Sequence, residues 1–323
     1  MSSVRVAVFD LGSSSFHLMV VDAYRDGGLV PVLRRRSFLH LGTEVARTGG
    51  VPADRATLAV RTVRRLRLAA DDAGVDVVVA LATAALRDAA NGSKLLARIE
   101  HVLGHPVVQL TGEEEARLCF VGQRAGVWVG REPVLGLDLG GGSLEAGVGT
   151  VDEVHEVASV PLGTARMSGE LGTVDVLTEP DRIAVGRLVV ARIGPIEAML
   201  ARTPSASGRV IASGGTVRAL ARLAIGLHRA PPDATSAPQM PVNQVELPAG
   251  QIHELADRLA GLDLEARLAL PGIQARRAPL LPIGAVVLST LVEKLGFHSL
   301  VVSEWGLREG AVFDALSLRA GRR

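Results

Sequence analysis

The chain has 323 residues, of which 48% are hydrophobic and 3% aromatic, so it can bury an aliphatic core and is long enough for two domains of roughly 100–200 residues each. Its formal net charge of +1 argues against a nucleic-acid binder. Cys119 is the single cysteine, so no internal disulfide can form. No apolar run approaches the ~20 residues of a membrane span, and no signal-peptide pattern opens the chain. We therefore expect a cytoplasmic protein without a membrane partner.

The predicted elements begin with three strands, Val4–Phe9, Phe16–Val21 and Leu29–Leu33. Between the first two strands lies a turn of small residues, Gly12, Ser13, Ser14 and Ser15. Such a turn lets a phosphate approach backbone N–H groups and hydroxyls. Asp10 would place a carboxylate beside that phosphate, and Mg²⁺ is the usual cation between two such anions. A hairpin tip of Gly and Ser is equally common for turn geometry alone.

Two arginine features come next. The run Arg34-Arg35-Arg36 is either a solvated strand end or an edge that faces an anion. Apolar residues at helical spacing then predict a helix up to Leu66, followed by a buried strand, Val75–Ala82. Arg87 follows the carboxyl end of this strand, where open α/β sheets bind ligands, although the pattern fits an ordinary surface arginine as well.

Three consecutive acidic residues, Glu113, Glu114 and Glu115, follow a predicted helix, Ser93–Leu103, and a short strand, Val107–Leu110. Acidic side chains in the first turn of a helix commonly complement the helix dipole. A carboxylate at the mouth of a phosphate cleft can also orient or deprotonate a water molecule. The residues alone leave both interpretations open.

The second half of the chain repeats the layout of the first, with strands over Pro133–Leu137, Leu144–Val148 and Val154–Val160. The first of these strands runs into Asp138, and the turn after it is Gly140, Gly141, Gly142 and Ser143. Two copies of strand, Asp-Leu-Gly turn and strand indicate an internal duplication. The sequence therefore predicts two similar α/β domains that face each other across a cleft.

A helical region from about Pro180 to Arg202 follows, with a break expected at Pro195. A strand beginning at Val210 then leads into a glycine-rich turn at the start of a helix, with Gly214, Gly215 and Thr216. Such a helix start suits a phosphate or a nucleotide, or it only lets strand and helix pack closely. Leu227–Pro248, with several prolines, is predicted to be a loop.

The last elements expected are helices over about Ala249–Leu259 and Leu280–Leu295, a strand over Ser299–Ser303 and a helix over Leu307–Leu318. The histidines show no metal-ligand spacing. His17 and His40 are therefore predicted to be structural or surface residues.

Taken together, the motifs resemble the exopolyphosphatase / guanosine pentaphosphate phosphohydrolase family of the sugar kinase, actin and heat-shock-chaperone ATPase superfamily. The resemblance covers nearly the whole chain and rests on Phe9 to Leu18, Ala84 to Ala89, Gly112 to Arg117, Leu137 to Glu145, Ala212 to Thr216 and Ser303 to Gly310. It implies an α/β fold of two ribonuclease-H-like (actin-like ATPase) domains facing each other across a cleft. We assign them to residues 1–125 and 126–323, with the last helix, about 307–319, packing back on the first domain.

The resemblance also implies roles for single residues. The family's catalytic glutamate directly precedes Ala in a Gly-x-Glu-Glu-Ala motif, which assigns the role to Glu115. Asp138 and Glu145 match acidic residues that hold Mg²⁺, and we add Asp10 to this metal set. Arg87 matches an arginine that faces the substrate phosphate. A homodimer is expected by family analogy.

Two departures from the family pattern qualify these roles. Ser14 stands where the family usually has Asn, so an amide contact to phosphate is lost while a hydroxyl remains. The longer members carry a C-terminal helical extension that this chain, ending at Arg323, lacks. With one tight basic run and a net charge of +1, the chain is expected to grip few phosphates beyond the terminal ones.

The sequence thus predicts a Mg²⁺-dependent exopolyphosphatase, with Mn²⁺ as an alternative ion. It would release terminal phosphate from inorganic polyphosphate, with short chains favoured, from guanosine pentaphosphate, or from both. Two alternatives remain open: a phosphotransferase (kinase) of the same superfamily, and a sensor that binds an alarmone or polyphosphate without turnover.

Overall fold

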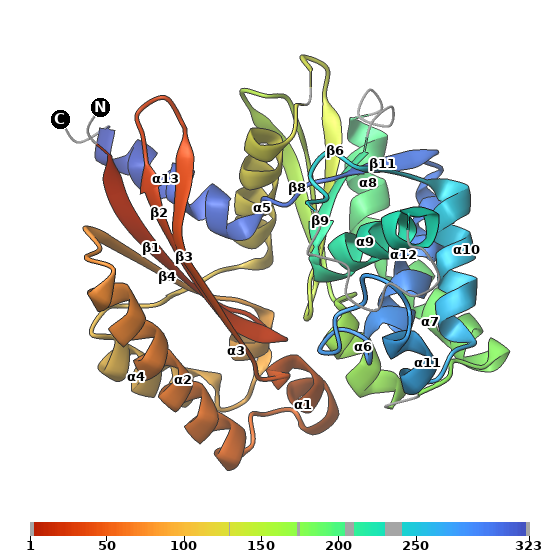
Figure 1. The fold of residues 1–323 in the computed structure, drawn as a ribbon, viewed down its shortest axis with the longest axis horizontal. Helices are drawn as coiled ribbons and strands as arrows, with labels where there is room; N and C mark the ends of the chain where they lie inside the picture. Colours follow the sequence, from red (N-terminus) through yellow and green to blue (C-terminus); the bar gives the residue numbers. More distant parts are fainter. Residues whose placement is uncertain (1–2, 129, 173–174, 204–209, 230–240, 321–323) are drawn as a thin grey trace.

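The structure, a computed structural model, describes residues 3–128, 130–172, 175–203, 210–229 and 241–320. Two mixed β-sheets lie side by side, and helices flank each of them (Figure 1). None of the helices in these ranges is long and apolar enough to cross a membrane.

The first sheet has the strand order β3-β2-β1-β4-β5. Its strands are β1 (Val4–Leu11), β2 (Ser15–Ala23), β3 (Leu29–Phe38), β4 (Val77–Ala82) and β5 (Val108–Gln109). Strand β1 pairs antiparallel with β2 and parallel with β4. The valine-rich β1 is buried along its middle, as its apolar run predicted.

The second sheet has the order β10-β11-β9-β6-β7-β8. Its strands are β6 (Val134–Leu139), β7 (Leu144–Gly149), β8 (Val154–Val160), β9 (Val210–Gly214), β10 (Glu246–Pro248) and β11 (Ser299–Val302). The run β8-β7-β6-β9-β11 repeats β3-β2-β1-β4-β5, with antiparallel pairs before β6 and parallel pairs after it. The duplicated motif therefore does mark a duplicated sheet.

The helices of the first half are α1 (Leu41–Thr48), α2 (Ala53–Asp72), α3 (Ala84–Asp88), α4 (Gly92–Leu103) and α5 (Gly112–Gly126). Helices α2 and α4 pack against each other and bury Ala59, Val63 and Ile99 in the core of the first sheet. Helix α1 was not predicted. It begins at His40, which has a positive φ of 53° and makes no side-chain cap, so its start carries no recognisable signal.

The helices of the second half are α6 (Thr164–Leu171), α7 (Glu179–Arg192), α8 (Gly194–Arg202), α9 (Gly215–Arg229), α10 (Ala249–Ala260), α11 (Leu264–Leu268), α12 (Leu281–Leu295) and α13 (Leu307–Ala320). The predicted break near Pro195 is confirmed, because α7 and α8 meet there. The predicted loop over Leu227–Pro248 is wrong at both ends, which belong to α9 and β10, and its residues 230–240 lie outside the described residues.

Helices α5 and α13 each pack across the two halves. Helix α5 lies against β7 and β8 of the second sheet, while α13 comes from the end of the chain and packs on β1, β4 and α5 (Figure 1). Because α5 lies almost wholly within residues 1–125 yet covers the second sheet, the domain boundaries at 1–125 and 126–323 stay a prediction.

Close backbone contact holds α5 and α13 together. A Cβ on Gly310 would lie 1.9 Å from the carbonyl oxygen of Leu118, and a Cβ on Gly122 would lie 2.0 Å from that of Gly306. Real Cβ atoms do not approach backbone this closely. Glycine is therefore required at both positions for the helices to pack as they do.

We expect Gly310→Ala to lower the free energy of unfolding by about 1–3 kcal/mol, because the added methyl group must push the two helices apart. Gly186→Ala is the matched control, since that glycine lies inside α7 and its Cβ would meet only the Thr290 Oγ1, at 3.9 Å. The control should be stabilised by about 0.5–1 kcal/mol. Urea unfolding of both variants checks this, and equal stabilities would contradict the packing described.

Candidate active site

A pocket of ≈ 130 Å³ is lined by residues of both halves. It lies at the strand ends where the two small-residue turns meet. Of the predicted site residues, those that line it are Asp10, Gly12, Ser13, Ser14, Ser15, Glu115, Asp138, Gly140, Gly141, Gly142, Ser143, Glu145, Gly214, Gly215 and Thr216. Arg87 does not line this pocket. The fold thus brings together segments that are far apart in the sequence.

Hydrogen bonds fix the shape of both turns. In the first, the backbone N–H of Ala85 donates to the Ser13 Oγ at 3.1 Å, and the N–H of His40 donates to the carbonyl of Ser14 at 3.0 Å. In the second, the N–H of Ala165 donates to the carbonyl of Gly141 at 2.8 Å. With their carbonyls bonded to neighbouring segments, the turns are held as rigid rims of the pocket.

The two turns approach each other so closely that only small residues fit. A Cβ on Gly141 would lie 2.2 Å from the Ser14 Oγ, and a Cβ on Gly142 would lie 2.4 Å from the Ser13 Oγ. The Ser14 hydroxyl therefore faces Gly141 directly.

Four carboxylates from different elements share the pocket: Asp10 on β1, Asp138 on β6, Glu145 on β7 and Glu115 on α5. Burial raises the pKa of Asp10 to about 6 and the pKa of Glu145 to about 8. It also raises the pKa of Asp138 and that of Glu115, and Glu145 adds its charge to the effect on Glu115. Burial disfavours the negative charge on these carboxylates. A hard cation such as Mg²⁺, which binds oxygen ligands, would stabilise their ionised form.

Of the three consecutive glutamates, Glu115 alone lines the pocket. Glu114 is exposed and accepts from the backbone N–H of Thr111 at 2.8 Å, as the second half of a capping box. Glu115 is 7% exposed, and its Oε2 has no hydrogen-bond partner. A buried carboxylate oxygen without a donor can accept a hydrogen bond from a ligand or a water molecule.

Arg87 lines an adjoining pocket that shares Gly142 and Ser143 with this one, and its expected place facing the substrate phosphate stays a prediction. Its Nη1 is 3.5 Å from the Glu115 Oε2 and donates to the carbonyl of Leu110 at 2.8 Å. Its Nε is 3.4 Å from Asp88, which also pairs with Arg166. In this arrangement Arg87 acts on the charge of Glu115.

His17 lines the pocket, although the sequence pattern predicts a structural or surface residue. Strand pairing places it opposite Asp10, just as it places Glu145 opposite Asp138. The ring contacts Arg308 Nη1 at 2.5 Å and the Ser15 Oγ at 2.8 Å. Burial and the charge of Arg308 hold its pKa well below the usual range, so the imidazole is neutral. The duplicated motifs could have indicated His17 through this pairing.

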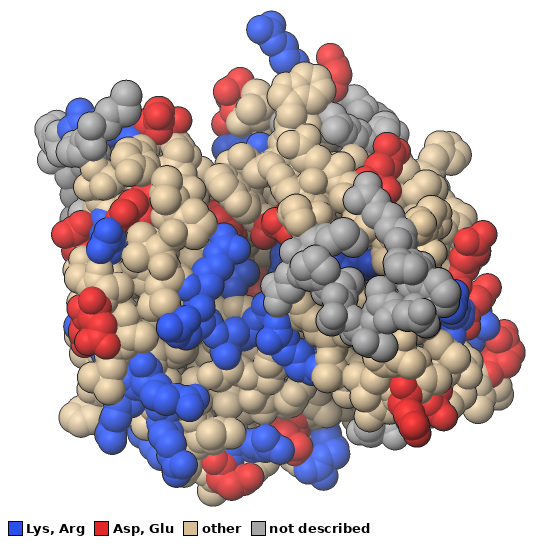
Figure 2. Space-filling model, viewed as in Figure 1, with Lys and Arg blue, Asp and Glu red and all other residues tan. Residues whose placement is uncertain are grey.

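A cluster of arginines surrounds the pocket and was also missed. We call it the arginine cluster; its members are Arg36, Arg218, Arg222, Arg276, Arg277 and Arg308. Figure 2 shows basic side chains gathered along the junction of the two halves. Partial desolvation and the like charges of neighbouring arginines lower the pKa of Arg36 to about 10 and the pKa of Arg277 well below its ordinary value. An anionic ligand would relieve this repulsion.

The cluster corrects the expectation that Arg34-Arg35-Arg36 is the main basic feature. Arg36 is exposed, and its guanidinium carbon lies 5.3 Å from the ring centroid of Phe38, as does that of Arg276. Arg34 is exposed, 3.8 Å from Glu309. The other members come from α9, from the segment before α12 and from the start of α13, so no run in the sequence shows the cluster.

The chain matches the Ppx/GppA phosphatase family over residues 20–319. It belongs to this family. Among similar proteins, exopolyphosphatase 1 of Mycobacterium tuberculosis is 32% identical, over 98% of this chain and 90% of that protein. Exopolyphosphatase 1 of Mycobacterium leprae is 31% identical, over 98% of this chain and 91% of that protein.

Solved structures agree with this assignment. The Ppx/GppA family member of Aquifex aeolicus superposes with a TM-score of 0.77 at 27% identity, over 98% of this chain and 99% of that one. An exopolyphosphatase of Cytophaga hutchinsonii has the same fold, with a TM-score of 0.87 at 24% identity, over 97% and 98% of the two chains. The resemblance and the predicted two-domain, actin-like α/β fold are thereby confirmed, and the Ppx/GppA chain is an enzyme of a phosphatase family.

The carboxylate pKa values predict how stability depends on pH. Because the pKa of Asp10 and that of Glu145 are raised in the folded state, their contribution to stability is complete at low pH and is lost as the pH rises through about 6 and about 8. The melting temperature of metal-free protein should therefore fall as the pH rises from about 5 to about 8. Saturating Mg²⁺ should flatten this fall.

Melting temperatures measured across that pH range, with and without Mg²⁺, check this prediction. The variant Glu145→Gln removes one of the two titrating groups and should itself show a flatter profile. An unchanged pH profile in the variant would mean that the Glu145 carboxyl is ionised in the folded protein as readily as in water.

Proposed function

We propose that this Ppx/GppA chain is a Mg²⁺-dependent hydrolase that removes the terminal phosphate from inorganic polyphosphate. The observation that carries the proposal is the combination, in one pocket, of two small-residue turns, buried carboxylates and the arginine cluster. The names of the mycobacterial relatives support polyphosphate as the substrate. Guanosine pentaphosphate ends in the same phosphoanhydride and is proposed as a second substrate.

In the proposed reaction, the turns Gly12–Ser15 and Gly140–Ser143 bind the terminal phosphoryl group through backbone N–H groups and hydroxyls. Glu115 accepts a hydrogen bond from the attacking water and takes its proton, because its Oε2 is buried and has no donor. Arg87 keeps that side chain in place from behind. Such positioning and electrostatics are what phosphoryl transfer mainly requires.

Asp10, Asp138 and Glu145 would hold the Mg²⁺ ion. The three side chains offer carboxylate oxygens and come from both halves of the chain. Their pKa values are raised, and a bound cation would lower them again. When bound, Mg²⁺ supplies positive charge beside the phosphate oxygens. The turns bind the phosphoryl group, and Glu115 is the proton acceptor.

A kinase of the same superfamily is the second candidate and would need room for a nucleotide near Gly214–Thr216. The guanidinium of Arg277 fills the space beside Gly215, since a Cβ there would lie 1.8 Å from its Nη1. This contact favours a phosphate over a nucleoside at that turn. A sensor without turnover would not need a buried glutamate in the pocket whose Oε2 accepts no hydrogen bond.

Phosphate release from polyphosphate, guanosine pentaphosphate and ATP tests the proposal. We expect release from polyphosphate, no activity in the presence of a chelator, and recovery with Mg²⁺ or Mn²⁺, because the carboxylates repel a polyanion unless a cation intervenes. Transfer from ATP to an acceptor, without release from polyphosphate, would favour the kinase. Full activity after exhaustive chelation would contradict the metal requirement.

We expect Glu115→Gln to lower kcat by about 10²–10⁴, the usual contribution of a general base, while substrate binding is kept. Glu114→Gln is the matched control on the same helix, and glutamine can retain the capping contact with Thr111. Steady-state phosphate release measures both variants. Turnover near that of the wild type in Glu115→Gln would remove Glu115 from the mechanism.

The arginine cluster should hold the phosphates next to the terminal one and none farther along the chain. Affinity should therefore rise over the first few phosphates and then level off, with short chains cleaved at least as well as long ones per chain end. Arg277→Ala should raise the KM by about tenfold or more, the value of a charge-assisted hydrogen bond. Arg182→Ala, at an exposed pair with Asp257, is the control.

Product analysis on a long, uniform polyphosphate tests the limit of this grip. Progressive shortening through intermediate lengths is expected for a site that releases its substrate after each cleavage. Intact long chains beside free phosphate, with nothing between them, would instead indicate that the chain is held over a much greater length.

A further inference from the structure

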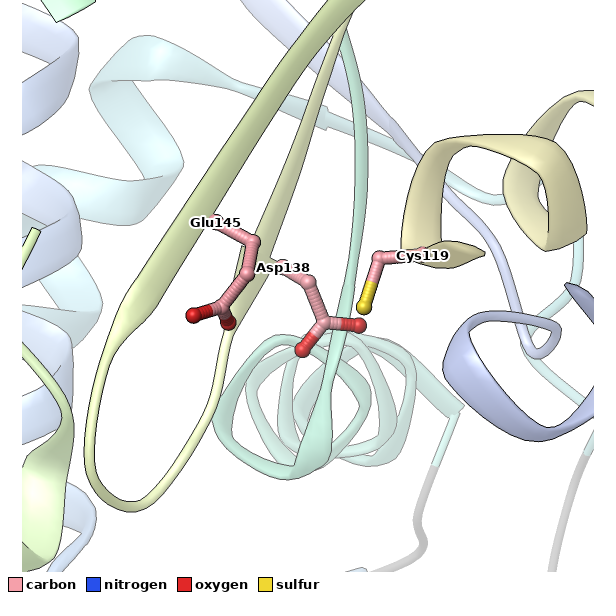
Figure 3. A group of neighbouring side chains, drawn as sticks. All are labelled: Cys119, Asp138 and Glu145. Carbon is pink, nitrogen blue, oxygen red and sulfur yellow. The ribbon is translucent and has the colours of Figure 1, made fainter. Parts of the chain in front are cut away.

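Cys119 is a pocket residue to which the proposed reaction gives no role. It lies one helical turn after Glu115 on α5, so the same face of the helix presents both side chains to the pocket. Its Sγ and one oxygen each of Asp138 and Glu145 all lie within 4.8 Å of one another. Figure 3 shows the thiol directed at the Asp138 carboxylate, with Glu145 on the far side of it.

We infer that Cys119, Asp138 and Glu145 form a site for a thiophilic divalent cation such as Zn²⁺ or Cd²⁺. Such an ion would share two carboxylates with the Mg²⁺ of the proposed function. The thiol makes the site different in metal preference, because Mg²⁺ binds oxygen ligands whereas Zn²⁺ readily takes thiolate.

The donor spacing suits such an ion. Zinc bonds to thiolate sulfur at about 2.3 Å and to carboxylate oxygen at about 2.0–2.2 Å, so the ligands of one ion lie about 3–4.5 Å apart. The three donors, within 4.8 Å of one another, need only small side-chain rotations to reach one ion. As the metal–sulfur bond forms, the thiol proton leaves to solvent.

The surroundings of the three donors support a built site. Ser213 donates to Asp138, and the Ser159 Oγ donates to the Glu145 Oε1 at 3.1 Å, so hydroxyls orient both carboxylates. Glu115, 7% exposed, lines the same pocket with an Oε2 that has no hydrogen-bond partner. That oxygen lies 3.5 Å from Arg87 Nη1, so water would take the fourth position on the ion.

Occupation by Zn²⁺ would remove Asp138 and Glu145 from Mg²⁺. Zinc should therefore inhibit hydrolysis in competition with Mg²⁺, and this consequence, unlike the binding itself, rests on the proposed function. Cys119 alone would thus make the hydrolytic pocket a site where a thiophilic metal ion inhibits the reaction.

Cadmium titration of the purified metal-free protein, without substrate, tests the binding. Because Cys119 is the single cysteine of the chain, any ultraviolet cadmium–thiolate absorption must come from it. We expect this absorption to saturate at one Cd²⁺ per chain in the wild type and to be absent in Cys119→Ser and Cys119→Ala. Glu145→Gln should keep the absorption but weaken Cd²⁺ affinity by about tenfold or more.

Two results would overturn the inference. One is wild-type protein that gives no thiolate absorption with Cd²⁺, a result that needs no variant to fold. The other is equilibrium dialysis in which Cys119→Ser binds Zn²⁺ as tightly as the wild type, which would assign the ion to carboxylates alone. The titration uses no substrate, so loss of the proposed hydrolysis and loss of this site are separate outcomes.

Discussion

Mutual repulsion among buried carboxylates is the constraint on which the rest of the site depends. Asp10, Asp138, Glu145 and Glu115 come from three strands and one helix and converge on one small pocket. Water cannot solvate four such charges there, so each must hold a proton, face a cation or pair with an arginine. Arg308, 4.0 Å from Asp10, and Arg87, 3.5 Å from Glu115, provide part of that compensation. A bound cation would provide the remainder.

The duplication gives the two halves the same scaffold but different chemistry. Asp10 and Asp138 occupy equivalent strand ends, yet the residue across the strand pair is His17 in one half and Glu145 in the other. A neutral imidazole bonded to Arg308 makes the first half the more cationic side, while Glu145 makes the second half the more anionic one. A ligand with a polyanionic tail and a bound cation would therefore be oriented, with its anionic part toward the first half and its cation toward the second.

Local pattern was enough to predict most of the fold and the rims of the pocket. The Asp-Leu-Gly turns, the acidic run that ends at Glu115 and the turn at Gly214 are contiguous motifs, and the structure brings them together. The motif of Arg87 indicates that it lies near the site, but a sequence cannot show that its side chain contacts Glu115.

What could not be predicted is the set of residues that only tertiary packing brings to the pocket. Arg218 and Arg277 stand in no motif, and they join the arginine cluster because the start of α9 and the segment before α12 both line the pocket. From the sequence, Cys119 indicates only that no internal disulfide can form. Its closeness to Asp138 and Glu145 cannot be predicted, because it depends on how α5 lies on the second sheet. Helix α1 was missed for a local reason, the absence of a capping side chain.

Helix α13 makes the first sheet depend on the last part of the chain. The face of β1 and β2 with Val6, Val8 and Met19 is buried against Ala311 and Val312 of that helix. During synthesis on the ribosome, this apolar face emerges long before the helix that covers it. The nascent first half therefore has one finished core, beneath α2 and α4, and one open face that cannot close until residues 307–320 have been made. Two halves that resemble independent domains must then acquire their final form together.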